Sequence, residues 1–321
     1  MSQQGISELP TRGREVIELE GLSREFDGRV AVEGLTFKVE EGEIFGLLGP
    51  NGAGKTTTVR MLCSLIRPTR GRARVCGHDV VKEAERVREV VGLLPENPGL
   101  YGELSAYENL EFHARLHGLP EGRRRENIER FLRMLDLWER RNDPVATFSR
   151  GMQQKLAIVR ALLHEPEVLF LDEPTASLSP EAAGIVRDFI LELKREGRTI
   201  FLCTHNLYEA ERLCDRVAIL STRLLALGSP GELKRRFGSP RTEVHLERVT
   251  EELVEAVRGL GFVRGVEVEG EKLVVELEDP ETQNPSLVEA LVRRGGRVRY
   301  VTPSPHALEE TYLRLVRGSE A

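Results

Sequence analysis

One segment, from Gly42 to Thr57, limits the possible folds of this chain more than any other. An apolar run from Ile44 to Leu48 predicts a buried strand, a glycine-rich turn follows from Gly49 to Gly54, and helical spacing begins at Lys55. Together they give the pattern G-x-x-x-x-G-K-[ST] in the strand–loop–helix setting of a phosphate-binding loop. A glycine-rich turn with a chance lysine is the alternative, and it does not explain the complete pattern in this setting. The segment therefore predicts an α/β fold built around a phosphate site.

The residues of this loop suit the binding of a nucleotide. Successive backbone N–H groups of a glycine-rich turn can surround phosphate oxygens, at a helix N-terminus whose dipole favours anions. Lys55 would reach the β- and γ-phosphates and assist catalysis there, and the Thr56 hydroxyl would ligate Mg²⁺. The candidate nucleotide-binding residues of this segment are Gly49, Asn51, Gly52, Ala53, Gly54, Lys55, Thr56 and Thr57.

A second apolar strand, expected from Val168 onward, ends in the neighbouring acids Asp172 and Glu173. Acids at the carboxyl end of a buried strand are what a Mg²⁺–phosphate site in an α/β sheet needs. Asp172 could hold the Mg²⁺ shell, and Glu173 could take a proton from an attacking water or orient it. Two acids at a strand end can also be ordinary solvated residues, but the phosphate-binding loop favours the metal site.

Three other positions fit either a structural or a functional role. Phe26 lies in an expected turn from Arg24 to Gly28, where an aromatic residue can pack in a hairpin or contact a nucleotide. Ser149 suits the N-cap of a helix, which is an ordinary feature unless a ligand lies near it. His205 follows an expected strand, where it is either a packed loop residue or a contact to a γ-phosphate.

Composition narrows the class of protein. At 321 residues the chain is long enough for about two domains, and a net charge of −6 does not suggest a nucleic-acid partner. The four cysteines have no paired metal-ligand spacing, which favours free thiols in a reducing compartment. The sequence has no apolar signal core and no apolar run of the roughly 20 residues that span a bilayer. We expect a cytoplasmic chain that meets a membrane only through a partner.

The pattern of elements predicts two domains. The α/β domain is expected over 14–235, interrupted by a helical insert over about 96–160, and Gly228–Gly231 marks its end. A small α+β domain over 240–321 shows the order βαββαβ, which suggests a ferredoxin-like fold. Its helices include expected ones at Ser286–Arg294 and Ala307–Val316. This domain has no catalytic constellation, so a docking, dimerisation or regulatory module is the default expectation.

Four motifs follow one another along the chain in this order: the phosphate-binding loop, Ser149-Arg150-Gly151-Met152-Gln153, Leu171-Asp172-Glu173 and His205. With them the chain resembles an ABC transporter ATP-binding subunit over roughly residues 14–235. The resemblance implies a P-loop NTPase core of the ABC type with antiparallel β and helical subdomains. The C-terminal part resembles the small extra domain of the drug- and sodium-exporter branch of bacterial and archaeal ABC ATPases.

The resemblance also implies roles for residues that the pattern left open. Phe26 matches the aromatic residue that stacks on adenine, Glu173 the catalytic base, and His205 the switch histidine that touches the γ-phosphate. Ser149 and Gly151 match signature residues that touch the γ-phosphate from the opposite subunit of a head-to-tail dimer. Gln153, in the same signature segment, is a candidate nucleotide-binding residue with them.

Two positions depart from the family pattern. The family usually has Gln where this chain has Glu96, at the position that follows Mg²⁺ and links it to the helical insert. Glu is still an oxygen ligand, so Glu96 joins Thr56 and Asp172 as a candidate metal ligand. The family usually has Asp where this chain has Ser179, and the loss of that charge bears on coupling between subunits.

The expected function is ATP hydrolysis, with Mg²⁺, that powers a membrane exporter. The implied partners are a separately encoded integral-membrane permease and a second ATP-binding subunit, expected to be a second copy of this chain. The implied location is the cytoplasmic side of the cell membrane, as a peripheral subunit. Two alternatives are a regulatory ABC ATPase with weak hydrolysis, motivated by Glu96 and Ser179, and a non-transport ABC ATPase. The site residues Lys55, Asp172, Glu173 and His205 are intact, which argues against the first. A single phosphate-binding loop without long heptads argues against the second.

Overall fold

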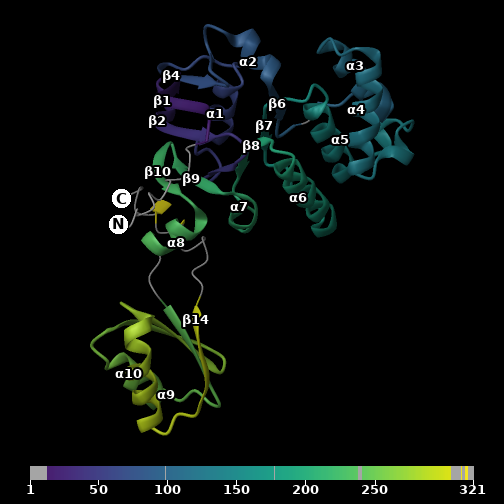
Figure 1. Ribbon diagram of the computed structural model, residues 1–321. Helices are drawn as coiled ribbons and strands as arrows, with labels where there is room; N and C mark the ends of the chain where they lie inside the picture. Colours follow the sequence, from purple (N-terminus) through teal and green to yellow (C-terminus); the bar gives the residue numbers. More distant parts are fainter. Residues whose placement is uncertain are drawn as a thin grey trace, which may run out of the picture. The chain divides into compact units, whose positions relative to one another are not determined.

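The computed structural model describes residues 13–97, 99–176, 178–237, 241–304, 312 and 315–316. The chain forms two compact units, Met1–Ser229 and Pro230–Ala321, and the helix α8 (Pro230–Phe237) begins the second. The first unit is an α/β structure with two sheets and a group of helices, and the second has its own sheet (Figure 1). The predicted fold class is therefore confirmed.

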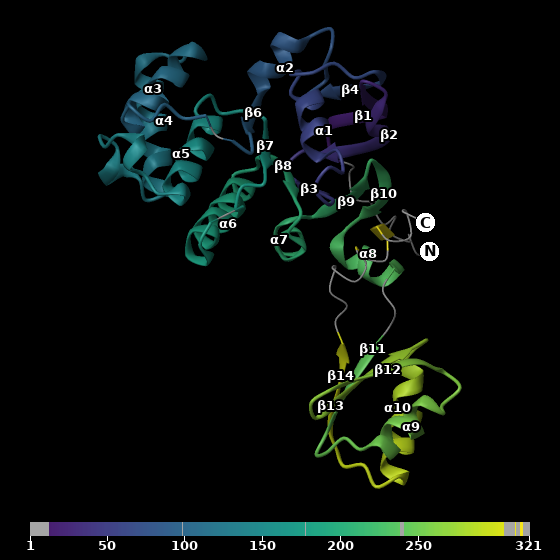
Figure 2. The same ribbon diagram turned by 180° about the vertical axis from the view of Figure 1, so that it is seen from behind.

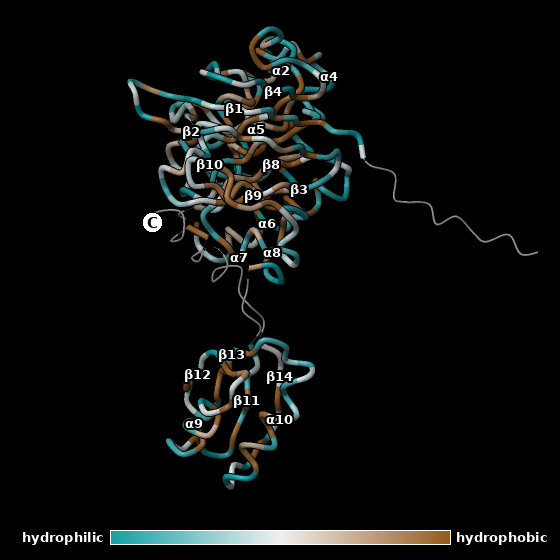
Figure 3. The backbone as a smooth tube through the Cα atoms, turned by 90° about the vertical axis from the view of Figure 1, so that its left-hand side faces the viewer, coloured by the Kyte–Doolittle hydropathy of each residue, from teal (hydrophilic) through white to brown (hydrophobic). Residues whose placement is uncertain are grey.

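A six-stranded sheet in the order β10-β9-β3-β8-β7-β6 organises the first unit. Its strands are β3 (Ile44–Leu48), β6 (Val91–Leu94), β7 (Val168–Asp172), β8 (Thr199–Thr204), β9 (Arg216–Ser221) and β10 (Arg223–Gly228). All neighbours pair in parallel except β10, which runs antiparallel to β9. Every residue of β3, β7 and β8 is buried, as expected of a parallel sheet covered on both faces. In Figure 3 the hydrophobic brown colour accordingly follows much of the sheet around β8 and β9.

The parallel arrangement places three strand ends together. β3 and β8 pair with Leu48 opposite Thr204, and β7 and β8 pair with Asp172 opposite Cys203. The phosphate-binding loop, the acid pair and His205 each follow one of these three strands. All three segments therefore leave the sheet at the same edge, which is where α/β proteins bind ligands.

A second, antiparallel sheet in the order β2-β1-β4-β5 shares a hydrophobic core with the first. Its strands are β1 (Glu15–Phe26), β2 (Arg29–Glu40), β4 (Arg70–Val75) and β5 (His78–Asp79). Phe37 of β2 stacks on Phe45 of β3 with ring centroids 5.1 Å apart. The sequence interpretation placed Phe26 inside a turn. This is wrong, since Phe26 is the last residue of the strand β1. Bulges interrupt the pairing of β1 with β2, and buried and exposed residues do not alternate regularly along β1.

The helices of the first unit are α1 (Lys55–Leu62), α2 (Ala84–Val90), α3 (Ala106–Leu116), α4 (Glu121–Met134), α5 (Arg150–Leu162), α6 (Pro180–Arg195) and α7 (Leu207–Leu213). Two short 3₁₀ turns, Trp138–Arg140 and Val145–Thr147, lie between α4 and α5. In both ribbon views α3 and α4 lie to one side of the six-stranded sheet, with α5 beside them (Figures 1 and 2). The buried Asn109 fixes the loop before α3, since its side chain bonds the backbone N–H and C=O of Tyr101.

The second unit contains a four-stranded sheet in the order β12-β13-β11-β14, antiparallel throughout. Its elements are β11 (Arg241–Leu246), α9 (Glu251–Arg258), β12 (Val263–Glu269), β13 (Lys272–Leu277), α10 (Pro280–Arg293) and β14 (Val298–Ser304). This is the order βαββαβ with the strand arrangement of a ferredoxin-like fold. One hydrophobic core joins the sheet to both helices.

The expected start of α10 at Ser286 was wrong. The helix begins at Pro280, with Asp279 as its N-cap, and it contains Pro285. Proline is unfavourable in a helix interior, so the sequence interpretation began the helix too late. The helix expected at Ala307–Val316 lies outside the described residues except at Tyr312, Leu315 and Val316.

No helix within the described ranges is long and apolar enough to cross a membrane.

Candidate nucleotide-binding site

The backbone of the phosphate-binding loop needs its glycines. Gly52 and Gly54 have φ angles of 82° and 100°, in the left-handed region that other residues seldom adopt. A Cβ atom on Gly54 would lie 2.5 Å from the Ala31 carbonyl oxygen, and one on Gly49 would lie 2.5 Å from that of Leu220. Gly54 is also the N-cap of α1, and it has no side chain with which to cap the helix. The first N–H groups of α1 are thus free to bind an anion.

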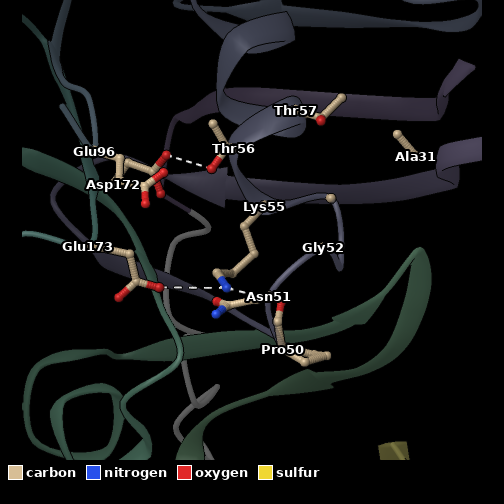
Figure 4. Close-up of a pocket in the computed structure, with 11 residues that line it drawn as sticks. Ala31, Pro50, Asn51, Gly52, Lys55, Thr56, Thr57, Glu96, Asp172 and Glu173 are labelled. Carbon is tan, nitrogen blue, oxygen red and sulfur yellow. Dashed lines mark hydrogen bonds and ion pairs between the residues drawn. The ribbon is translucent and has the colours of Figure 1, made fainter. Parts of the chain in front are cut away.

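A cleft of about 410 Å³ opens beside this loop (Figure 4). One wall consists of Pro50 and the loop residues that follow it, and the other contains Glu96 and the two acids at the end of β7. The full set of lining residues is Ala31, Pro50, Asn51, Gly52, Gly54, Lys55, Thr56, Thr57, Glu96, Asp172 and Glu173.

Lys55 points across the cleft toward Glu173 (Figure 4). Its Nζ atom donates to the carbonyl oxygens of Gly49 at 2.7 Å and Pro50 at 3.2 Å, and it lies 3.6 Å from Glu173 Oε1. Lys55 is only 6 % exposed, so this ammonium group is nearly removed from solvent. A buried ammonium group has N–H donors that can bind the oxygens of a phosphate.

Asp172 and Thr56 form an oxygen-rich corner of the cleft. Thr56 Oγ1 donates to Asp172 Oδ2 at 2.8 Å. Burial raises the pKa of the Asp172 carboxyl group; the hydrogen bond from Thr56 opposes this shift, and the nearby charges of Glu173 and Glu96 add to it. A divalent cation at this corner would favour the charged carboxylate. A hydroxyl and carboxylates are oxygen donors of the kind that Mg²⁺ takes, so these residues fit that ion.

Glu173 connects the acid corner to the end of β8. Its φ angle of 51° places a residue other than glycine in the left-handed region, which is strained. Its Oε1 atom lies 2.9 Å from His205 Nδ1, and the His205 side chain is 57 % exposed. A carboxylate held between a lysine and a histidine can accept a proton or orient a water molecule.

A second cleft of about 340 Å³ shares Glu96 and Glu173 with the first. It is lined by Glu96, Asn97, Arg150, Gln153, Gln154, Glu173, Ala176 and Leu178. Gln153 therefore lies on the same cleft as Glu173, and its amide also donates to the carbonyl of Val145 at 3.3 Å. The beginning of α5 thus borders the acid end of the site.

Some predicted site residues do not line the first cleft, as far as the described residues go. Ser149 is the N-cap of α5 and accepts from the Met152 N–H at 3.3 Å, and a Cβ on Gly151 would lie 3.3 Å from Ala182 Cβ. Phe26 is 40 % exposed, and the guanidinium of Arg24 lies 4.2 Å from its ring centroid. The roles of these residues stay predictions, as do those of Gly49 and Ala53, which support the loop without lining the cleft.

Sequence reasoning missed Ala31 as a lining residue. It lies on β2, and its carbonyl approaches Gly54 so closely that no side chain fits between them. An alanine in a strand carries no sequence signal for such a role. Pro50 was also left out, although it lies within the loop pattern itself.

Comparison with known families and proteins matches both parts of the chain. The model of the ABC transporter family matches residues 32–176, and the model of the ATP-binding protein DrrA1-3-like C-terminal domain matches residues 228–316. The daunorubicin resistance ATP-binding protein DrrA3 of Streptomyces coeruleorubidus is 38 % identical over 302 residues, which covers 93 % of this chain and 95 % of that protein. The Nod factor export ATP-binding protein I of Ralstonia nicotianae is 36 % identical over 318 residues, covering 97 % of this chain and 95 % of that protein.

Solved structures give the same result for the fold. The ATP-binding subunit of an ABC transporter superposes with a TM-score of 0.64 at 37 % identity, covering 70 % of this chain and 93 % of that chain. The protein cbiO1 from Clostridium perfringens, part of the ABC transporter complex cbiONQ, superposes with a TM-score of 0.63 at 28 % identity. That match covers 69 % of this chain and 91 % of cbiO1.

Proposed function

The chain belongs to the ABC transporter family of ATP-binding subunits, and on this premise we propose how its residues perform the reaction. Its activity is the hydrolysis of ATP that powers a membrane exporter. The observation that carries the assignment of residues is a single cleft in which Lys55, Thr56, Asp172 and Glu173 converge beside the phosphate-binding loop.

The triphosphate is expected to lie along the loop, with its terminal phosphate at Lys55. The N-terminus of α1 and the ammonium group of Lys55 both favour the negative charge that develops in phosphoryl transfer. Thr56 and Asp172 would hold Mg²⁺, with Glu96 as a further oxygen donor, and the ion would neutralise charge on the phosphates. The aromatic ring of Phe26 would stack on the adenine.

Glu173 is placed to act on the attacking water. As the water oxygen bonds to the γ-phosphorus, the bond from phosphorus to the ADP oxygen breaks, and the proton of the water passes to a Glu173 oxygen. His205, at 2.9 Å from Glu173 Oε1, would orient this carboxylate and the γ-phosphate. The strained backbone of Glu173 is consistent with a residue held in a working position.

A second copy of the chain would complete each site. Ser149 and Gly151 lie at the N-terminus of α5, a helix end that favours anions, but within one chain they do not line the phosphate cleft. A head-to-tail pair with two-fold symmetry would bring this helix end to the partner's nucleotide and make two equal sites.

We expect the membrane permease to dock on a groove of the first unit. A groove of about 210 Å³ is lined by residues of β6, of the helices α2, α3 and α5 and of the segment that follows α1. Its apolar lining residues include Leu93 and Leu65, and Leu65 is 54 % exposed. Arg88 and Arg160 add positive charge. An apolar helix of the permease that carries an acidic residue would match this groove. This docking would hold the chain at the cytoplasmic face of the membrane.

ATP hydrolysis by the purified chain tests the residue assignment. We expect Mg²⁺-dependent phosphate release that Lys55→Ala abolishes, while the surface substitution Lys82→Ala leaves it unchanged. Co-purification with a candidate permease subunit should be lost in Leu65→Asp. Wild-type turnover in Lys55→Ala would contradict the proposed site.

A further inference from the structure

A cluster of one buried and two partly buried polar side chains, outside both clefts, joins three segments of the first unit. Thr175 lies in the loop after β7, Arg187 on α6 and Glu209 on α7, and the two helices pack against each other. Thr175 Oγ1 donates to Glu209 Oε1 at 2.6 Å, and Arg187 Nη1 donates to the same oxygen at 3.2 Å. Glu209 is 1 % exposed. A carboxylate is seldom buried to this extent unless it is paired, as Glu209 is with Thr175 and Arg187.

These contacts form a closed ring with two proposed catalytic residues. Thr175 follows Glu173 by two positions along the chain, and Glu209 lies in the first turn of α7, just after His205. The N-cap of that helix, Asn206, accepts from the Glu209 N–H at 3.3 Å. The ring is closed on the other side by the 2.9 Å contact between His205 Nδ1 and Glu173 Oε1.

The ring acts on a segment whose backbone is strained. Glu173 keeps a φ angle of 51°, and such a conformation persists only where the surrounding structure fixes it. The loop that follows is a compact turn, in which the Ala176 N–H donates to Glu173 O at 3.1 Å and the Leu178 N–H donates to Thr175 O at 3.2 Å. Anchoring the Thr175 side chain therefore restrains the peptide unit that carries Glu173.

We propose that Glu209 is a positioning residue for ATP hydrolysis. Through Thr175 and Arg187 its buried carboxylate holds the loop of Glu173 and the helix that follows His205 in one arrangement. The inference rests on the roles proposed above for Glu173 and His205. It concerns turnover and not nucleotide binding, because the hydrogen bonds of Lys55 and Thr56 go to Gly49, Pro50 and Asp172. Lys55 meets the ring only in its 3.6 Å contact with Glu173.

The pairing pattern indicates which variants separate positioning from folding. Only one oxygen of Glu209 is engaged; Oε2 has no hydrogen-bond partner among the described residues. Thr175→Val removes the hydroxyl at nearly constant volume and leaves the Arg187–Glu209 ion pair intact, and Thr175→Ser restores the donor. Glu209→Gln removes the charge and keeps the shape.

The matched control is Glu43→Gln. Glu43 is 9 % exposed and pairs with Arg216 at 3.0 Å, so it is also a buried glutamate–arginine pair. It precedes β3, at the end of the sheet opposite the phosphate-binding loop. This variant measures what the loss of a buried charge does to stability alone.

The experiment compares kcat, the ATP dissociation constant and Tm of the full chain and these variants. We expect Thr175→Val and Glu209→Gln each to lower kcat at least tenfold, with ATP affinity within twofold of wild type. Thr175→Ser should recover kcat to within threefold. The double variant Thr175→Val/Glu209→Gln should be no slower than the slower single variant, since both break the same ring. Glu43→Gln should lower Tm without lowering kcat.

Three results would overturn the inference. The first is a wild-type kcat in Thr175→Val, and the second is an additive loss of kcat in the double variant. Either result would mean that Glu209 does not act through Thr175 on the loop that carries Glu173. The third is a fall in kcat for Glu43→Gln as large as that for Glu209→Gln at equal loss of Tm. If the wild-type chain binds ATP without hydrolysing it, the roles proposed for Glu173 and His205 are wrong as well. The assay of the wild-type chain shows this outcome before any variant is compared.

Discussion

Replacing Glu173 by glutamine should stop turnover while leaving ATP binding intact. The substitution keeps the shape of the side chain and removes the group proposed to accept a proton from water. General-base catalysis contributes about 10²- to 10⁴-fold to a rate, which corresponds to about 3 to 5 kcal/mol of the barrier. We therefore expect kcat to fall by about two to four powers of ten.

The effect on binding follows from the ion pair in the free cleft. Lys55 Nζ lies 3.6 Å from Glu173 Oε1, and the two side chains are 7 % and 14 % exposed. Their direct attraction is about 4 to 5 kcal/mol at an effective dielectric constant of about 20, and desolvation offsets much of it. In the glutamine variant a phosphate no longer competes with this carboxylate for Lys55, so ATP should bind at least as tightly as in wild type.

Phosphate release and equilibrium ATP binding should be measured on the same preparation, with size-exclusion chromatography to detect a nucleotide-trapped dimer. Glu167→Gln is the matched control, because Glu167 precedes the same strand β7 at its amino end and its side chain is half exposed. It should behave as wild type. If kcat of Glu173→Gln stays within threefold of wild type, Glu173 is not the base.

Three further predictions concern the metal, the dimer and pH. Glu96→Gln should keep ATPase activity because the amide oxygen remains a ligand, whereas Glu96→Ala should raise the Mg²⁺ concentration needed for half-maximal rate; equal Mg²⁺ titrations would exclude contact with the metal. Mixing inactive Lys55→Ala with inactive Ser149→Arg should restore partial activity if subunits exchange, since one site of each mixed dimer carries neither lesion; confirmed mixed dimers without activity would contradict shared sites that turn over independently. Burial lowers the pKa of His113 and His164 to about 4, below the value near 6.5 of the unfolded chain, so the unfolded state binds more protons between these values. The free energy of unfolding should therefore fall as pH is lowered from about 6.5 to 4, and a Tm that does not change over this range would refute the assignment.

The sequence predicts best those parts of the site that depend on residues close together in the chain. The strand–loop–helix setting around Lys55 and the strand that ends in Asp172 both follow from short apolar runs, and the carboxyl ends of parallel strands meet at one edge. This reasoning predicted an acid pair beside the loop, and the structure has Thr56 Oγ1 2.8 Å from Asp172 Oδ2 across 116 positions of sequence.

The sequence does not predict the burial or the partners of a side chain whose neighbours come from distant parts of the chain. Glu209 looks like an ordinary surface residue of a short helix, yet it is buried because Thr175 and Arg187 meet it from 34 and 22 positions away. The bulges of β1 and the proline within α10 are failures of a different kind. Each breaks the local period from which an element is recognised, although tertiary packing still supports that element.

The charges of the cleft explain why it should bind a metal–nucleotide complex and not a free nucleotide. Its lining contains one cation, Lys55, and three carboxylates, those of Glu96, Asp172 and Glu173. A polyanionic triphosphate alone would face this excess of negative charge, and the raised pKa of Asp172 shows that burial already disfavours its charged form. A bound Mg²⁺ ion would reverse both effects, since it would attract the phosphates and favour the ionised carboxylate. Glutamate at position 96, in place of the family's glutamine, adds a negative charge to this balance, so this chain should depend on Mg²⁺ for nucleotide binding more strongly than a relative with glutamine there.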